Sequence, residues 1–74
     1  MRIFNRYPVL KTVLVNTKTG STFSGVLWQK RLGFLVLKNA RMLRRDKEPM
    51  AMDGEVVVLA DNVDFIQVIK AVNG

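Results

Sequence analysis

The spacing of its short apolar runs is the feature that most limits how this chain can fold. Runs rich in valine, leucine, isoleucine and phenylalanine recur along the 74 residues, and turn-forming residues separate each run from the next. Runs of this length and composition favour strands over helices. We expect five strands, at Lys11–Asn16, Ser21–Lys30, Phe34–Leu43, Glu55–Ala60 and Val63–Val68. This pattern predicts one all-β domain, residues 1–74, folded as a small, strongly bent five-stranded barrel.

The segments between the runs carry residues that favour turns. Thr17–Gly20 ends on glycine and predicts a hairpin between the first two strands. Gly25, inside the second run, predicts a bend, a bulge or a close backbone approach. Asp61–Asn62 predicts a tight turn, because both residues tolerate left-handed backbone. Arg44–Gly54 is charged and contains Pro49, so we expect a loop there.

The chain ends carry weaker signals. The first ten residues mix apolar and basic side chains around Pro8, and we expect a short helix or arm there. No run reaches the roughly 18 apolar residues of a membrane span, and no signal-peptide pattern is present. We therefore expect a cytoplasmic protein that does not engage membranes.

The residue types exclude several classes of chemistry. The chain has no cysteine and no histidine, so we expect no disulfide, no metal site and no cofactor. It contains neither a nucleophile elbow nor a glycine-rich phosphate loop. Asp61 and Asp64 lie close together, but a turn explains them better than an acid–base pair. We predict that the protein is not an enzyme.

The size of the chain favours oligomerisation. A domain this short leaves roughly 40% of its unfolded-chain surface exposed after folding, so its own core is marginal. Small domains usually add a disulfide, a metal or a partner subunit. With no cysteine or histidine, the partner subunit is the option left. A hydrophobic content of 49% also indicates that some apolar side chains are buried between subunits.

The charge is distributed unevenly along the sequence. Residues 1–45 hold ten lysines and arginines and no acid, whereas residues 46–74 hold two basic and six acidic residues. The halves carry +10 and −4, which gives the net charge of +6. Such asymmetry predicts a surface with a basic side that attracts phosphates, although solubility alone would also account for the charge.

Two sequence blocks resemble the Sm/LSm/Hfq family. The first signature of the family is an apolar strand, a glycine turn, Gly-x-Leu and a second apolar strand. A similar order is present in Val13–Leu27 followed by Phe34–Ala40. Val56–Ile66 is similar to its second signature, in which a strand enters and leaves a tight turn. The resemblance covers nearly the whole chain and rests on the order of common motifs. Short, divergent chains of this kind resemble phage-encoded members.

The resemblance implies a ring. In the family, the fourth strand of one subunit pairs with the fifth strand of the next, and repetition of this contact closes a homo-oligomer. We expect five to seven subunits. Pairing of this kind also removes two exposed sheet edges, which would account for the apolar character of the last two strands. A monomeric SH3-like or OB-like barrel is the alternative fold.

The chain departs from the family where RNA-binding members read a base. The family's aspartate position falls on Lys30 or Arg31, and its asparagine position on Gly33 or Phe34. The family's arginine-glycine pair aligns with Leu59–Ala60. The uridine-reading pocket therefore cannot be transferred to this sequence.

Other residues supply a candidate nucleic-acid site. Lys30 and Arg31 fall in the segment that lines the pore in the family, where several copies would form a basic collar that favours phosphates. Trp28 and Phe34 flank them as stacking platforms, or as core or interface residues. A second basic cluster follows the third strand and would bind phosphate on a ring face, or else form a solvated loop; it comprises Arg41, Arg44, Arg45 and Lys47.

Two functions follow from these observations. The first is a ring that binds RNA, most simply single-stranded RNA, or another polyanion with weak sequence specificity. The second is a structural or scaffold ring that binds an unidentified protein partner, which the missing uridine pocket favours. The basic first half of the chain favours the first function.

Overall fold

The computed structural model describes residues 8–69, and strands dominate this part of the chain. The elements are β1 (Thr12–Thr17), β2 (Thr22–Arg31), β3 (Phe34–Arg44), β4 (Lys47–Ala51), β5 (Glu55–Leu59), the 3-10 helix η1 (Ala60–Asn62) and β6 (Val63–Val68). The all-β prediction is confirmed. The expected N-terminal helix or arm lies mostly outside the described residues, and the described end of that segment, Val9–Leu10, is a turn.

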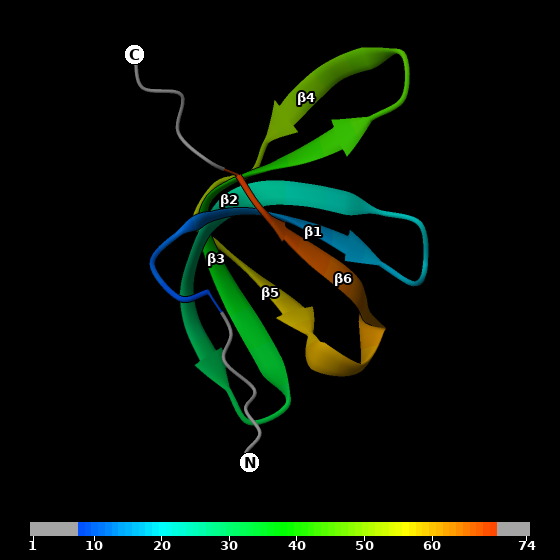
Figure 1. Cartoon of the computed structure of the whole chain (residues 1–74). Helices are drawn as coiled ribbons and strands as arrows, with labels where there is room; N and C mark the ends of the chain where they lie inside the picture. Colours follow the sequence, from blue (N-terminus) through cyan, green and yellow to red (C-terminus); the bar gives the residue numbers. More distant parts are fainter. Residues whose placement is uncertain (1–7, 70–74) are drawn as a thin grey trace.

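The strands form one antiparallel sheet that curls strongly but does not close (Figure 1). The strand order is β4-β3-β2-β1-β6, and β5 pairs with the first part of β3. The last part of β3 pairs with β4 instead. Because β3 changes its partner along its length, β5 stays with the curled body while β4 projects away from it (Figure 1). Among the described strands, β5 and β6 do not pair, so the expected barrel has an open seam.

The strand β4 was not expected from the sequence, so the described residues form six strands where five were predicted. It lies inside the predicted loop Arg44–Gly54. The chain reverses at Arg45–Asp46, where Asp46 has a positive φ of 59° that aspartate tolerates. Pro49 lies where the register between β3 and β4 shifts, a position at which a strand accepts proline.

Gly25 allows β2 and β3 to approach closely, as predicted. A Cβ atom at this position would lie 3.0 Å from the carbonyl oxygen of Lys38 and 3.1 Å from the Cα of Ala40. These are backbone atoms, so a side chain here would push the two strands apart. The register between β2 and β3 shifts at Gly25 and again at Trp28, and bulges of this kind increase strand curvature.

The core lies on the concave side of the curled sheet. Its buried members come from four strands and are Val13 and Val15 of β1, Leu27 of β2, Leu35, Leu37 and Ala40 of β3, and Val58 of β5. Val36 is also buried, on the opposite face of β3. The apolar run at the start of β3 is therefore covered on both faces, as its sequence predicts.

The β1–β2 turn is fastened to η1. Thr17 is buried, and its hydroxyl donates to the Ser21 carbonyl (2.8 Å) while accepting from the Ser21 backbone N–H (2.9 Å). The Asn62 backbone carbonyl accepts a hydrogen bond from the Lys18 N–H at 2.7 Å. The side-chain amide of Asn62 donates to the Thr19 hydroxyl at 3.1 Å. The expected Asp61–Asn62 turn is present, but as a right-handed 3-10 helix without positive φ angles. These bonds place the β5–η1–β6 segment against β1.

Candidate nucleic-acid interface

The β2–β3 hairpin ends in a basic tip, defined here as residues 28–34. Lys30 and Arg31 are the last residues of β2 and pair with Leu35 and Phe34, so the strand extends one residue beyond the expected Ser21–Lys30 and includes both cations. The turn itself is Leu32–Gly33, in which Gly33 has a φ of 89°. The Leu32 side chain is 94% exposed. The tip therefore presents two cations beside an exposed apolar side chain.

A shallow, open hollow of about 680 Å³ lies on the tip. Four predicted residues line it, namely Trp28, Lys30, Arg31 and Phe34, together with Val9 from the segment before β1. The Arg31 Nε–H donates to Gln29 Oε1 at 3.1 Å, which orients the guanidinium along the strand. The structure thus brings the four predicted tip residues together around one surface that mixes aromatic and cationic groups.

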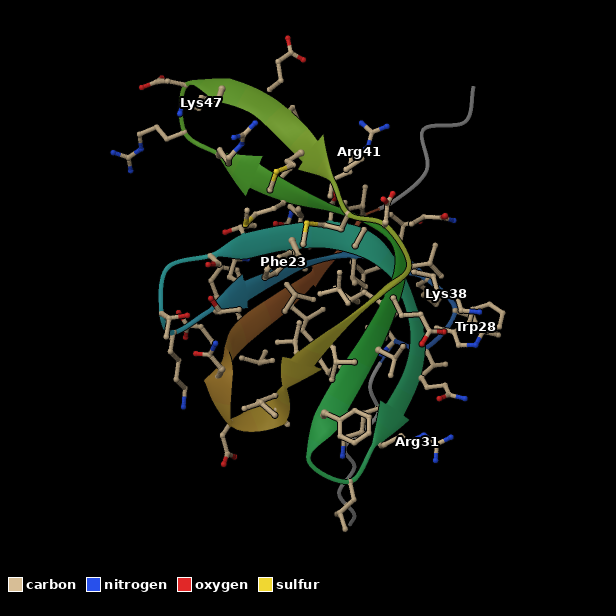
Figure 2. All side chains as sticks on the ribbon, turned by 180° about the vertical axis from the view of Figure 1, so that it is seen from behind. Phe23, Trp28, Arg31, Lys38, Arg41 and Lys47 are labelled. Atoms are coloured by element: carbon tan, nitrogen blue, oxygen red, sulfur yellow. The ribbon has the colours of Figure 1, made fainter. Side chains whose placement is uncertain are left out.

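Trp28 has an intramolecular partner that the sequence did not reveal. The Lys38 ammonium lies 3.9 Å from the centroid of its ring, and Figure 2 shows the two side chains next to each other. Lys38 also forms an ion pair with Glu55 of β5 at 3.7 Å. A base cannot stack on the ring face that Lys38 covers. Trp28 is 41% exposed, so the surface that it offers is the part that lines the hollow.

The second basic cluster lies on the hairpin of β3 and β4. We call residues 40–51 the arm, because this hairpin projects from the body (Figure 1). Its four cations are all exposed: Arg41, Arg44, Arg45 and Lys47. The Arg44 guanidinium donates to the Glu48 carbonyl across the hairpin, from Nε at 3.3 Å and from Nη2 at 2.9 Å. Arg44 is thereby held near the end of the arm.

The seven predicted site residues therefore form two groups. The tip carries four of them at one end of the molecule, and the arm carries the other three at the opposite end. Figure 2 shows this separation, with Arg31 and Lys47 at opposite ends. The sequence predicts two basic clusters, and the structure places them at opposite ends because β3 runs between them (Figure 2).

The free edges of β5 and β6 carry exposed apolar side chains. On β5, Val57 is 56% and Leu59 is 64% exposed, and they alternate with the buried Val58. On β6, Phe65 is 54% exposed and pairs with Asn16, on the side of β1 opposite the buried Val15. Val57, Leu59 and Phe65 therefore all point away from the core.

A second, smaller hollow of about 240 Å³ lies beside β5. The side chains of Phe23 and Val58 contribute apolar surface, while the hydroxyls of Thr19 and Ser21 and the side chain of Asn62 contribute polar groups. The hollow lies at the open seam of the sheet, between β5 and the β1–β2 turn. Of the core residues, Val58 lines this hollow.

No protein-family model matches the chain, and no curated protein matches its sequence. Within residues 8–69 no helix is long and apolar enough to cross a membrane. In the same residues no group of three or more acidic, histidine or cysteine side chains could hold a metal ion. The interpretation of the site therefore rests on its own geometry.

Proposed function

We propose that this protein is a short, divergent Sm-like protein that forms a closed ring of identical subunits and binds RNA, or another polyanion, through the basic tip. The main observation in support of the ring is that β5 and β6 each have a free edge with exposed apolar side chains. The observation that carries polyanion binding is the cluster of Lys30 and Arg31 around the tip hollow.

The two edges complement each other. A free edge exposes unpaired N–H and C=O groups, and a strand from another copy pairs with them. Because β5 and β6 lie on different sides of the seam, pairing β5 of one copy with β6 of the next is a head-to-tail contact. Such a contact closes into a ring when the rotation between subunits permits it.

The side chains along these edges are consistent with the same contact. In a paired sheet, residues that point outward on one strand neighbour outward residues on the next. Val57 and Leu59 of one subunit would therefore lie beside Phe65 of its neighbour. Aromatic and branched aliphatic pairs of this kind contribute about 0.2–1 kcal/mol each beyond alanine pairs.

The order of elements also supports the Sm-like assignment. Three meandering strands come first, and the last two strands surround the short turn η1. In a ring, the tips of all subunits would bring several copies of Lys30 and Arg31 together. Lysine and arginine contacts to phosphate carry no base information, so we expect weak sequence specificity and strong salt dependence.

A scaffold ring that binds a protein is the second candidate function. The observation that favours it is Leu32, which is 94% exposed at the end of the tip. Leu32 lines the tip hollow together with Val9, Trp28 and Phe34, so a protein partner with an apolar side chain would meet apolar surface there. In this case the tip hollow would receive an apolar side chain of the protein partner, and added RNA would not displace that partner.

Native mass spectrometry with short single-stranded RNA at low and moderate salt tests the first function. We expect a closed oligomer of five to seven subunits that takes up RNA and releases it as salt rises. The double variant Lys30→Glu, Arg31→Glu should keep the oligomer and lose RNA binding. The matched control Lys11→Glu, Lys18→Glu makes the same charge change away from the arm and the tip turn, and should retain most of the affinity.

Each other outcome has a clear meaning. A monomer at all concentrations would refute the ring. An oligomer that ignores RNA would transfer support to the scaffold function. Equal loss of RNA binding in the tip variant and its control would show that net charge, and not the tip, determines affinity.

A further inference from the structure

An extra residue in β3 places two of its cations on the same face of the sheet. Lys38 pairs with Val26, and Arg41 pairs with Ser24. Val26 and Ser24 lie two residues apart on β2 and therefore point to one face, which their cross-strand partners share. Lys38 and Arg41 are three residues apart, so a regular strand would turn them to opposite faces. The register shift, with Asn39 at a left-handed φ of 54°, brings them together.

The face that Lys38 and Arg41 share is the convex face of the sheet. Each of them follows a core residue directly, Leu37 and Ala40 respectively, and successive side chains of a strand point to opposite faces. Because the core lies on the concave side, both cations point away from it.

Arg31, at the tip, lies on the same face. Its partner Phe34 directly precedes the core residue Leu35, so Arg31 and Phe34 point away from the core. Figure 2 shows Arg31, Lys38 and Arg41 in this order along the outer side of the sheet, from the tip towards the arm. A series of cations therefore connects the two ends of β3.

The series ends in a hollow of about 410 Å³ at the far end of β3. Thr22 and Leu43 pair with each other and lie two residues beyond Ser24 and Arg41, so they belong to the same convex face. The hollow is lined by Gly20, Thr22, Leu43, Arg44 and Arg45. The acids of the arm lie elsewhere, in a separate hollow lined by Asp46, Lys47, Glu48 and Pro49. The hairpin thus separates its two arginines from its two carboxylates.

Most of these cations keep their full charge. The side chains of Arg41 and Arg45 form no hydrogen bond or ion pair with any described residue. Arg44 donates to the backbone carbonyl of Glu48, which positions the guanidinium without neutralising it. Lys38 pairs with Glu55 at 3.7 Å, and this pair is partly exposed to solvent. The convex face of β3 is therefore suited to contact several anionic groups spaced along a line.

We propose that the convex face of β3 is a track for single-stranded RNA, along which a strand anchored at the tip runs to the hollow at the end of the arm. This inference rests on the RNA binding proposed for the tip and adds the path of the strand beyond it. The cations of the track contact phosphates, so it adds affinity and not base choice. In order from the tip they are Arg31, Lys38, Arg41, Arg44 and Arg45. The eleven residues of β3 span about 36 Å.

Fluorescence anisotropy with labelled single-stranded RNAs of about 5 and about 30 nucleotides tests this proposal. At about 3.4 Å per stacked nucleotide, the short RNA spans about 17 Å and cannot follow the whole track, whereas the long RNA can. The variant Arg41→Gln, Arg45→Gln should weaken binding of the long RNA at least about tenfold, because a strand tethered at the tip makes the further contacts intramolecularly. It should also lower the slope of log affinity against log salt by about 1.4, since each phosphate contact of a single strand contributes about 0.7. Binding of the short RNA should be nearly unchanged.

Lys11→Gln, Lys47→Gln is the matched control, because it removes the same charge from positions outside the track. It should retain most of the affinity for the long RNA. Equal loss in both variants, loss in neither, or an equal loss for the short and the long RNA in the track variant would overturn the track and leave the tip in place. If the intact protein binds neither RNA, the tip is refuted and the track with it, so the two failures are distinguishable.

Discussion

The sheet has two kinds of edge, one with features that prevent strand pairing and one without them, and this difference bears on the proposed assembly. The end strand β4 carries Pro49 and the charged residues Lys47 and Glu48, and its register against β3 shifts beside Pro49. Natural proteins use these devices to prevent edge-to-edge association. The edge of β4 is therefore protected, although all five residues of this strand are exposed.

The edges of β5 and β6 have few of these features. After Glu55, β5 continues as three valines and a leucine, without proline, glycine or charge. β6 carries one charged residue, Asp64, and exposes Phe65. In the proposed ring, the free edges of β5 and β6 would be covered by neighbouring copies, whereas the protected edge of β4 would stay uncovered.

In the proposed ring, this contrast would account for how a small chain with an open seam is stabilised. The hollow beside β5 leaves the core partly uncovered in the single chain. A neighbouring β6 would cover it and satisfy the backbone groups of both strands. Assembly in this scheme completes the fold, which agrees with the expectation that a domain of this size needs support from a partner subunit.

The largest expected effect comes from a charge on the unprotected edge. Val57→Asp places a carboxylate where a neighbouring strand would bury it without a partner. A buried unpaired charge costs about 3 kcal/mol or more, which weakens each interface by more than a hundredfold. We expect the oligomer to dissociate to folded monomers, as measured by analytical ultracentrifugation together with circular dichroism.

Met50→Asp is the matched control for this prediction, because it introduces the same carboxylate on the protected strand. Met50 is 38% exposed in β4, so the variant should fold and assemble normally. Dissociation by both variants, or by neither, would remove the distinction between the two kinds of edge.

A smaller effect is expected when apolar surface is removed from β6. Phe65→Ala deletes a ring that is 54% exposed in the single chain and would be covered by Val57 and Leu59 of a neighbour. Truncation of a central aromatic at an interface costs about 2 kcal/mol, which raises the dissociation constant roughly 30-fold. Dilution experiments followed by light scattering measure this constant. Met50→Ala should leave it unchanged, and an equal shift in both variants would contradict the assignment.

The elements that the sequence predicted well share a strong local signal. Val63–Val68 agrees with β6 residue for residue, and the other four expected strands are within one residue of the observed bounds at each end. Their apolar alternation and flanking turn residues are sufficient to define them. Gly25 was also identified, because a glycine inside a strand usually marks a bulge or a close approach.

The missed features depend on contacts between distant residues. The sequence of β4 predicts a loop, because Pro49 and the charged residues are atypical of strands. Only its pairing with β3 makes this segment a strand. Likewise, Lys38 reaches Trp28 because the register shifts at Trp28, which no local pattern reveals. For the site, the residue types and their division into two basic clusters were predicted, but the position of these clusters at opposite ends of the molecule follows from the length of β3.

The smallest expected effect concerns the charges that fasten β5 to β3. Lys38 covers the Trp28 ring and pairs with Glu55, the first residue of β5. The ion pair is largely exposed, so it contributes about 0.2–1 kcal/mol, and the cation–π contact about 0.5–1 kcal/mol. Lys38→Met removes both and should lower the melting temperature by a few degrees, since about 1 kcal/mol corresponds to about 4–8 °C in a domain of this size.

Glu55→Gln separates the two contributions, because it removes the ion pair and leaves Lys38 over the ring. Trp28 is the one tryptophan of the chain, so its fluorescence reports on this contact directly. We expect Lys38→Met to change the emission and Glu55→Gln to leave it nearly unchanged, while both preserve the oligomer. Dissociation of the oligomer by either variant would show that the start of β5, and not only its apolar part, determines assembly.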